Sequence, residues 1–386
     1  MKKTAIAAMT ILFLFFFGES ALPAAGKPRA RELRVPFAGV PGPENAITDV
    51  AGVEVGHTTL ISGEGKLVVG RGPVRTGVTA VLPRGKRSFD DAVFAGWFSQ
   101  NGNGEMTGTT WVEESGFLEG PVLITNTHSV GVVRDAAIAW RVKQGGPDAS
   151  GYWWSLPVVA ETYDGWLNDI NGFHVKPEHV FQALSGAAGG PVAEGSVGGG
   201  TGMECYEFKG GIGTSSRRLS GALGGYTVGA LVQCNCGRRS QLTIAGVPVG
   251  LEIPKESSKG DQGSIIILVA TDAPLLPHQL KRLARRATMG LARTGSTSGN
   301  GSGDIFIAFS TANAGVWAAR GPAAVTMMPN DALNPVFEAT VQAVEEAIVN
   351  AMVGAESMTG IDGHRVEGLP HDKLREALKK YNRLAP

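Results

Sequence analysis

The chain has 386 residues, of which 43% are hydrophobic and 55 are glycine. This length is enough to bury a large core in one domain or in two closely packed halves. Its 35 Lys and Arg balance its 35 Asp and Glu. The composition therefore gives no electrostatic reason to expect a nucleic acid or an anionic membrane as partner, and function must depend on particular residues.

The first residues are typical of a secretory signal peptide. Lys2 and Lys3 precede an apolar run at 5–17, and the small residues at 24–26 offer a cleavage site. The run is too short to span a bilayer comfortably, although an uncleaved anchor is the alternative. No later segment is a transmembrane candidate. We predict a signal peptide at 1–26 and a periplasmic or secreted mature protein with no membrane contact.

The next segments predict an arm followed by alternating strands and helices. Residues 27–45 are basic and rich in proline, which indicates an arm or linker. Apolar and polar residues alternate at 45–60 and 76–85, as in strands of a half-buried sheet. Residues 120–127 predict another strand, and 129–145 have the apolar spacing of a helix that ends at glycine.

The second half of the chain continues this alternation. The Gly-rich stretch at 192–221 predicts short strands. Asn334 and Pro335 suit the cap and first turn of a long helix. The other predicted elements are a strand and polar loop at 156–172, strands at 226–237, 265–269 and 303–313, and helices at 273–295, 334–354 and 371–382.

This order of elements favours an α+β fold. The strands alternate or are short, and helices recur between groups of strands, so we expect sheets covered by helices rather than a doubly wound parallel sheet. The glycine-rich stretches contain neither a complete GxGxxG between a strand and a helix nor a GxxxxGK[ST] sequence, so phosphate binding is disfavoured.

The three cysteines give no sign of a metal site. Cys234 and Cys236 are two residues apart, and in a strand their side chains point to the same face, which is poor geometry for a disulfide between them. No second CxC or CxxC motif is present. We expect buried thiols and no bound metal.

One serine stands where a nucleophile could be held rigidly. Ser264 lies between Gly263 and an aliphatic run at 265–269. A turn would explain this placement. If the Gly263–Ser264 bond is cleaved, however, the new α-amine, with a pKa of about 8, becomes a built-in base beside the hydroxyl. Ser302 between two glycines precedes a strand, whereas the nucleophile elbow of an α/β-hydrolase follows one.

Several blocks together resemble the L-aminopeptidase/D-amidase-esterase (DmpA-type) family, which includes the β-peptidyl aminopeptidases. The resemblance begins near Asn45 and runs to the C-terminus, and its blocks are ITDVAGVEVGHTTL, TGVTAVLPRG, LVQCNCGRR, GSIIILVATDAPLLPHQLKRLARRATMGLARTG and SGDIFIAFSTAN. It implies a four-layer αββα sandwich like that of the N-terminal-nucleophile hydrolases, with the topology shared by DmpA and ornithine acetyltransferase.

The resemblance also implies how the chain matures. A single catalytic domain, 27–386, would cleave itself into an α chain of 27–263 and a β chain of 264–386. The chains would stay together, form a homotetramer of αβ heterodimers and use no cofactor.

The same resemblance assigns roles to residues of this sequence. Ser264 is the cleavage residue and nucleophile, and Ser302 with Asp304 orients its amine and hydroxyl and relays protons. Asn235 supplies an oxyanion donor. The alternatives are a Gly-rich turn in which Asp304 caps the backbone, and a strand Asn235 that satisfies a bulge.

Two further residues are implied to meet the substrate. Tyr163 matches a tyrosine of the DmpA-type branch that assists the oxyanion, whereas some β-peptidyl members have an apolar residue there, so the resemblance at this position favours the DmpA-type branch. Glu161 lies at the position that pairs with the substrate's free ammonium, since such recognition needs an anion in a partly dry site. The alternative for Glu161 is a solvent-facing strand residue.

We therefore expect a self-processing serine aminopeptidase that acts on short peptides, amides or esters with a free N-terminal amine, of L-, D- or β-residues. Two other functions stay open. An acyltransferase related to ornithine acetyltransferase shares the architecture, but it uses threonine and acts inside the cell. An exported binding protein without catalysis would make Ser264 only a turn.

Overall fold

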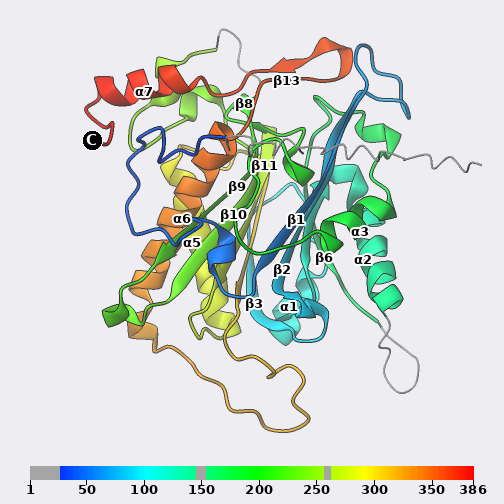
Figure 1. The fold of residues 1–386 in the computed structure, drawn as a ribbon, viewed down its shortest axis with the longest axis vertical. Coiled ribbons are helices and arrows are strands. Elements are labelled where there is room, and N and C mark those ends of the chain that lie inside the picture. The colour runs from blue at the N-terminus through cyan, green and yellow to red at the C-terminus, as the bar shows by residue number, and fades with distance from the viewer. Residues whose placement is uncertain (1–26, 145–153, 256–261) are drawn as a thin grey trace, which may run out of the picture.

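The protein has four layers, in which two β-sheets lie face to face and helices cover both outer faces (Figure 1). The computed structural model describes residues 27–144, 154–255 and 262–386. The predicted signal peptide therefore lies outside the described residues. Within the described ranges, every helix is too short or too polar to cross a bilayer. The predicted αββα sandwich is confirmed.

The smaller main sheet has four strands in the order β1-β2-β5-β6. Strands β5 and β6 are parallel, and the other neighbours are antiparallel. The alternation at 76–85 marks the second strand correctly, whereas the strand predicted at 45–60 begins only at Glu54, after a 3₁₀ helix at Ile47–Asp49. The strands are β1 (Glu54–Ser62), β2 (Val74–Lys86), β5 (Val122–Asn126) and β6 (Val158–Thr162).

The larger sheet has six strands in the order β4-β3-β12-β11-β10-β9. Strands β11 and β12 are parallel and central, and antiparallel strands flank them. Both faces of a central strand are buried, which explains the continuous aliphatic run of β11. The strands are β3 (Val93–Gly102), β4 (Phe117–Leu118), β9 (Gly211–Arg218), β10 (Thr227–Asn235), β11 (Gln262–Thr271) and β12 (Gly301–Ser310).

Four long helices form the outer layers. Helices α5 (Pro277–Arg293) and α6 (Asn334–Val353) pack on the six-stranded sheet, and α2 (Val130–Gln144) and α3 (Pro177–Ser185) pack on the other. The predicted cap of α6 was wrong by one residue. Leu333 is the N-cap, and Asn334 is already the first helical residue.

Short elements complete the described fold. Two small hairpins lie outside the main sheets. These elements are α1 (Thr109–Ser115), α4 (Val249–Glu252), α7 (His371–Lys380), β7 (Glu204–Cys205), β8 (Phe208–Lys209), β13 (Met358–Thr359) and β14 (Arg365–Val366).

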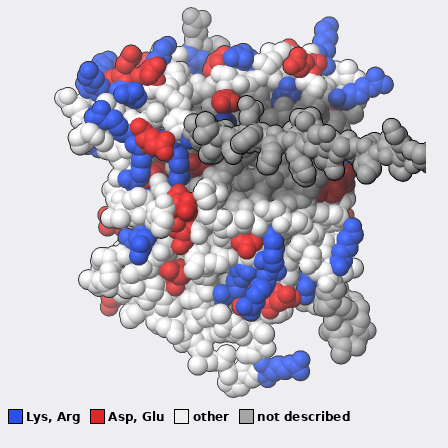
Figure 2. Space-filling view, in the orientation of Figure 1, with Lys and Arg blue, Asp and Glu red and all other residues white. Residues whose placement is uncertain are grey.

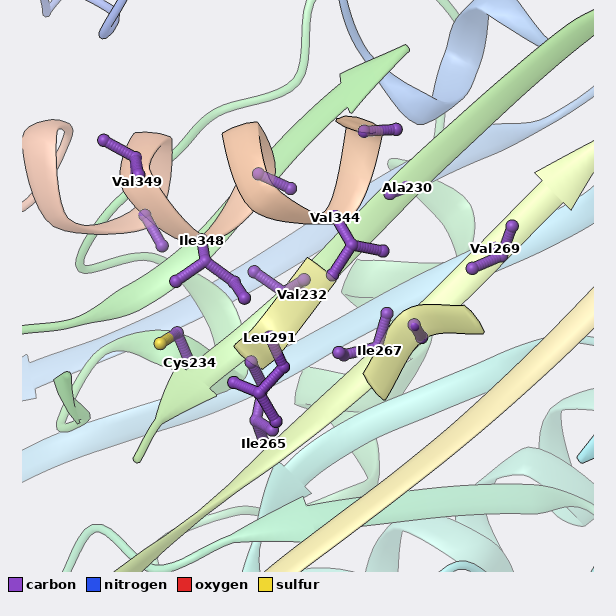
Figure 3. Packing of buried hydrophobic residues seen from close by; sticks show 14 of the residues in the cluster. Ala230, Val232, Cys234, Ile265, Ile267, Val269, Leu291, Val344, Ile348 and Val349 are labelled. Atoms are coloured by element: carbon purple, nitrogen blue, oxygen red, sulfur yellow. The ribbon is translucent and has the colours of Figure 1, made fainter. Parts of the chain in front are cut away.

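The core divides into three apolar clusters, one in each space between layers. Strand β11 contributes to two of them because its side chains alternate. Ile265 and Ile267 point toward α5 and α6, where they pack near Leu291 (Figure 3). Ile266 and Leu268 belong to the cluster between the sheets. The six-stranded sheet thus has a helix face and an inter-sheet face.

The N-terminal segment is not a loose linker. Arg29 pairs with Glu194, and Arg31 pairs with the fully buried carboxylate of Glu346 on α6. Ala30 between them is completely buried. The basic residues that suggested an exposed arm are instead the groups that fasten it, since buried carboxylates need cationic partners.

The expectation of three buried thiols was wrong. Cys205 and Cys234 form a disulfide across 29 residues of sequence, and Cys236 keeps a buried thiol. The spacing of Cys234 and Cys236 does argue against a bridge between those two. It carried no information about Cys205, which the β7–β8 hairpin brings to the end of β10.

Candidate active site

The predicted nucleophile lies where three strands of the larger sheet end together. Ser264 on β11 pairs in register with Asn235 on β10 and with Gly303 on β12. Ser264 and Asn235 are each 6% exposed. Both lie in phase with inter-sheet residues of their strands, such as Ile266 and Leu231. The two side chains therefore share the inter-sheet face.

The residue before the serine must be glycine. Gly263 has φ of +149°, a conformation that L-residues rarely adopt, and a Cβ there would collide with the carbonyl oxygen of Asn235. The backbone is continuous from Gly263 into Ser264, as part of β11. The Ser264 hydroxyl oxygen accepts a hydrogen bond of 3.1 Å from the Gly303 N–H. A rigid strand and one donor thus hold this hydroxyl.

Two hydrogen bonds fix the orientation of the Asn235 amide. Its Oδ1 accepts from the Glu204 N–H at 2.7 Å, and its Nδ2 donates to the Tyr163 carbonyl at 3.0 Å. An amide nitrogen carries two hydrogens, so the second is left for another acceptor. The arrangement suits a donor to a developing oxyanion on the face that carries Ser264.

The predicted serine and acid pair forms, but on the other face of the sheet. Ser302 donates to Asp304 Oδ1 at 2.6 Å, and both side chains are buried. Asp304 is in phase with Phe306 in the cluster under α5 and α6. In register, Ser302 pairs with Gly263 rather than with Ser264. The pair therefore flanks Gly263, the residue that cleavage would make the last of the α chain.

Glu161 belongs to the opposite sheet and lies near the loop that borders the end of β12. It lies on β6, is 3% exposed, and accepts from the Glu105 N–H at 3.0 Å and from the Thr127 hydroxyl. The alternative of a solvent-facing residue is thus wrong. Burial raises the pKa of Glu161, and these two hydrogen bonds oppose the rise. Gly104 lies close to both Gly303 and Glu161. A Cβ placed on Gly104 would be 3.1 Å from Gly303 Cα and 3.3 Å from Glu161 Oε1, so the loop that contains Gly104 lies between β12 and Glu161.

Tyr163 contacts Asn235 through its backbone. Its side chain is 53% exposed, and the phenol lies against Gly165, where a Cβ would collide with it. Burial of its inner part raises the pKa of the phenol, and the charge of Asp164 adds to the rise. The ring therefore stands at the surface of the site, and its role toward the oxyanion stays a prediction.

One group of potential metal ligands occurs among the described residues, namely Cys205, Cys234 and Cys236. Two of these sulfurs are joined as the disulfide. A disulfide sulfur is not the thiolate that metals require. The group is therefore unsuited to metal in its bridged form.

Sequence reasoning missed the contributions of backbone and short polar side chains. The Gly303 and Glu204 N–H groups hold Ser264 and Asn235, and the Thr127 hydroxyl with the Glu105 N–H holds Glu161. A backbone N–H leaves no trace in residue type. The only available signal was the density of Gly, Thr and Asn at strand ends, which favours close backbone approach.

On the face of the molecule shown in Figure 2, positive and negative side chains intermingle, as expected from zero net charge. Attraction by a large field of one sign is therefore not a feature of this face.

Comparisons with known proteins agree with this geometry. Residues 45–366 match Peptidase family S58. The β-peptidyl aminopeptidase BapA of Sphingosinicella microcystinivorans is 59% identical over 375 residues, which cover 93% of each chain. The BapA of Sphingosinicella xenopeptidilytica is 48% identical over 388 residues, which cover 96% of each chain.

Solved structures give the same result. The L-aminopeptidase D-Ala-esterase/amidase of Ochrobactrum anthropi is described as a prototype of the serine aminopeptidases and a new variant of the N-terminal-nucleophile hydrolase fold. It matches with a TM-score of 0.86 and 51% identity, over 93% of this chain and 100% of that one. A Burkholderia sp. β-aminopeptidase matches with a TM-score of 0.85 and 49% identity, over 92% and 99%.

The family match spans most of the chain, and the fold and the described site fit it. It favours a peptidase over the acyltransferase and over the non-catalytic protein that the sequence left open. This chain belongs to Peptidase family S58 and is a hydrolase with the fold of an N-terminal-nucleophile hydrolase.

Proposed function

We propose that this serine aminopeptidase matures by cleaving its own Gly263–Ser264 bond and then uses Ser264 as its nucleophile. The observation that carries the proposal is the alignment of Asn235, Ser264 and Gly303 at one sheet end, beside a glycine that no other residue can replace without a clash. Cleavage would yield chains 27–263 and 264–386. The Ser302–Asp304 pair, next to Gly263, would then receive the new α-amine.

Turnover follows from these positions. The Ser264 hydroxyl attacks the carbonyl carbon of the substrate's N-terminal residue while the α-amine of Ser264 takes its proton. The Asn235 amide, with Tyr163 at the rim, donates to the resulting oxyanion. As the tetrahedral intermediate collapses, the leaving amine takes the proton and departs. Water then attacks the ester in the reverse proton sequence, which releases the N-terminal residue and restores Ser264.

Glu161 would select substrates that carry a free amine. Its carboxylate is buried on β6, and Gly104 lies between its Oε1 and Gly303 at the end of β12. A substrate ammonium is a charge-assisted partner for such an anion. An N-acetylated substrate cannot supply this charge and should be refused.

We propose β-residues as preferred N-terminal residues, with L-residues also accepted. The 59% and 48% identical relatives are β-peptidyl aminopeptidases, which supports the first choice, and the Ochrobactrum enzyme supports the second. The test compares p-nitroanilides of β-Ala, L-Ala and D-Ala, with N-acetyl-β-Ala as control. The highest kcat/KM is expected for β-Ala. Equal cleavage of the acetylated control would contradict the role of Glu161.

Export and assembly are further parts of the proposal. The Cys205–Cys234 disulfide supports an oxidising compartment, in which such bridges persist. Osmotic-shock fractionation of cells with the full chain should therefore release a processed protein that lacks 1–26. Light scattering of the purified protein tests the homotetramer of αβ heterodimers. An αβ monomer would overturn that part alone.

A further inference from the structure

We propose that the Cys205–Cys234 disulfide is a positioning element that orients the Asn235 amide toward the oxyanion. The inference rests on the proposed role of Asn235. The bridge joins the β7–β8 hairpin to the residue that directly precedes Asn235 on β10. Glu204, the residue before Cys205, gives its N–H to Asn235 Oδ1. Bridge and hydrogen bond therefore connect the same two segments one residue apart.

The bridge is one of several contacts that hold a turn of unfavourable conformation, together with the hydrogen bond between the Tyr206 and Thr294 hydroxyls and those from Arg239 to the Tyr206 and Glu207 carbonyls. Tyr206 and Glu207 both have positive φ, at 52° and 57°, although neither is glycine. Residues with side chains adopt this region at a cost, and persist there when surrounding contacts hold them. One such contact is the hydrogen bond of 2.7 Å from the Tyr206 N–H to the Cys236 carbonyl.

The other side of the bridge is rigid. Cys234 is fully buried on the helix face, among Val232, Ile265 and Ile348 (Figure 3). Strand β10 pairs with both of its neighbours along its length. Loss of the bridge should thus loosen the hairpin and not the strand. The Glu204 N–H would then move relative to Asn235 Oδ1.

A loosened Glu204 N–H has a defined chemical consequence. Asn235 Nδ2 would still have the Tyr163 carbonyl as acceptor, but Oδ1 would lose its fixed donor. The amide could then rotate, and the N–H aimed at the oxyanion would be held in place for a smaller fraction of the time. Because this donor acts in the transition state, the loss should lower kcat and leave KM nearly unchanged.

The test compares two mature enzymes in one background. Cys236→Ala keeps the bridge and removes the remaining thiol, so it is the reference. Cys205→Ala added to it removes the bridge. With β-Ala p-nitroanilide, we expect kcat to fall about tenfold, which is less than complete loss of an oxyanion donor, and KM to change less than twofold. Equal kcat in the two enzymes would overturn the proposal.

A double-mutant cycle separates positioning from general stability. In an Asn235→Ala background, removal of the bridge should change kcat less than twofold, because the group that it positions is gone. A tenfold loss in that background too would show that the bridge acts elsewhere and would overturn the inference. If the Cys236→Ala reference cleaves no aminoacyl anilide at all, the proposed function is wrong. If the reference is active and removal of the bridge leaves kcat unchanged, only the role of the bridge is wrong.

If the Cys205→Ala variant does not mature, the bridge can instead be opened chemically in enzyme that has already matured. Mature Cys236→Ala enzyme is treated with TCEP, and the opened thiols are counted by alkylation and mass spectrometry. Activity should fall in proportion to the fraction of opened bridges and return on reoxidation. Full activity with the bridge open would overturn the proposal.

Discussion

The two faces of the larger sheet differ sharply at the end where Ser264 lies. The inter-sheet face carries Ser264 and Asn235, and the loop that contains Gly104 lies between the end of β12 and Glu161 of the other sheet. The helix face carries the Ser302–Asp304 pair and the cysteine group. The proposed nucleophile and oxyanion donor therefore lie on one face, and the serine–acid pair proposed to hold the new α-amine lies on the other. Strand alternation alone makes this separation.

Serines on the two faces should respond most differently. Ser264→Ala should abolish self-cleavage and reduce activity by roughly 10⁵-fold or more, as expected for loss of a nucleophile. Ser302→Ala should slow maturation and turnover without abolishing them, because it holds the amine and does not attack. Gel electrophoresis and anilide kinetics measure both effects. Ser310→Ala, at the far end of β12, is the matched control and should keep wild-type activity.

Removal of the oxyanion donor should have the next largest effect. Asn235→Ala should lower kcat by about 10²- to 10³-fold with little change in KM. Steady-state kinetics on the fraction that has matured would measure this. A rise in KM at constant kcat would instead show that Asn235 binds the substrate equally in the ground state and the transition state. That result would contradict its role as the oxyanion donor.

The carboxylate from the opposite sheet should affect binding. Glu161→Gln should raise KM by about 10- to 100-fold, because a hydrogen bond to a charged group contributes about 1.5–3 kcal/mol. Burial raises the pKa of Glu161, so the carboxylate is neutralised at a higher pH than an exposed glutamate. KM should thus rise as pH falls in the wild type and stay flatter in Glu161→Gln. Glu114→Gln, an exposed residue of α1, is the control.

The smallest effect on kcat is expected for Tyr163, whose side chain is half exposed at the surface of the site. Tyr163→Phe keeps the ring and the backbone carbonyl that accepts from Asn235, and loses only the hydroxyl. We expect kcat to fall by less than tenfold, since the side chain is half exposed and water can replace it. A loss as large as that for Asn235→Ala would show that the phenol is a full oxyanion donor.

The sequence predicted the side chains of the site better than the arrangement around them. Ser264, Ser302, Asp304, Asn235 and Glu161 all lie at the sheet ends, because strand periodicity and family blocks are local signals. Strand β3 was missed, although it lies inside the larger sheet between β4 and β12. Its residues 93–102 mix aromatic, polar and glycine residues without clear alternation, and a bulge interrupts its pairing with β12.

Long-range contacts could not be predicted for a physical reason. The bridge from Cys205 to Cys234 and the ion pairs of Arg29 and Arg31 join residues far apart in sequence. No periodicity encodes such pairs. The division of Ser264 and Asp304 between two faces also needed the strand register, which places Gly263 rather than Ser264 beside Ser302.

The most direct test of the account is N-terminal sequencing with intact mass measurement of the purified protein. We predict two chains in equal amounts, one of which begins at Ser264 and ends at Pro386. The Ser264→Ala variant should give one uncut, inactive chain. A single full-length chain with undiminished aminopeptidase activity would contradict the assignment of Ser264 as cleavage residue and nucleophile.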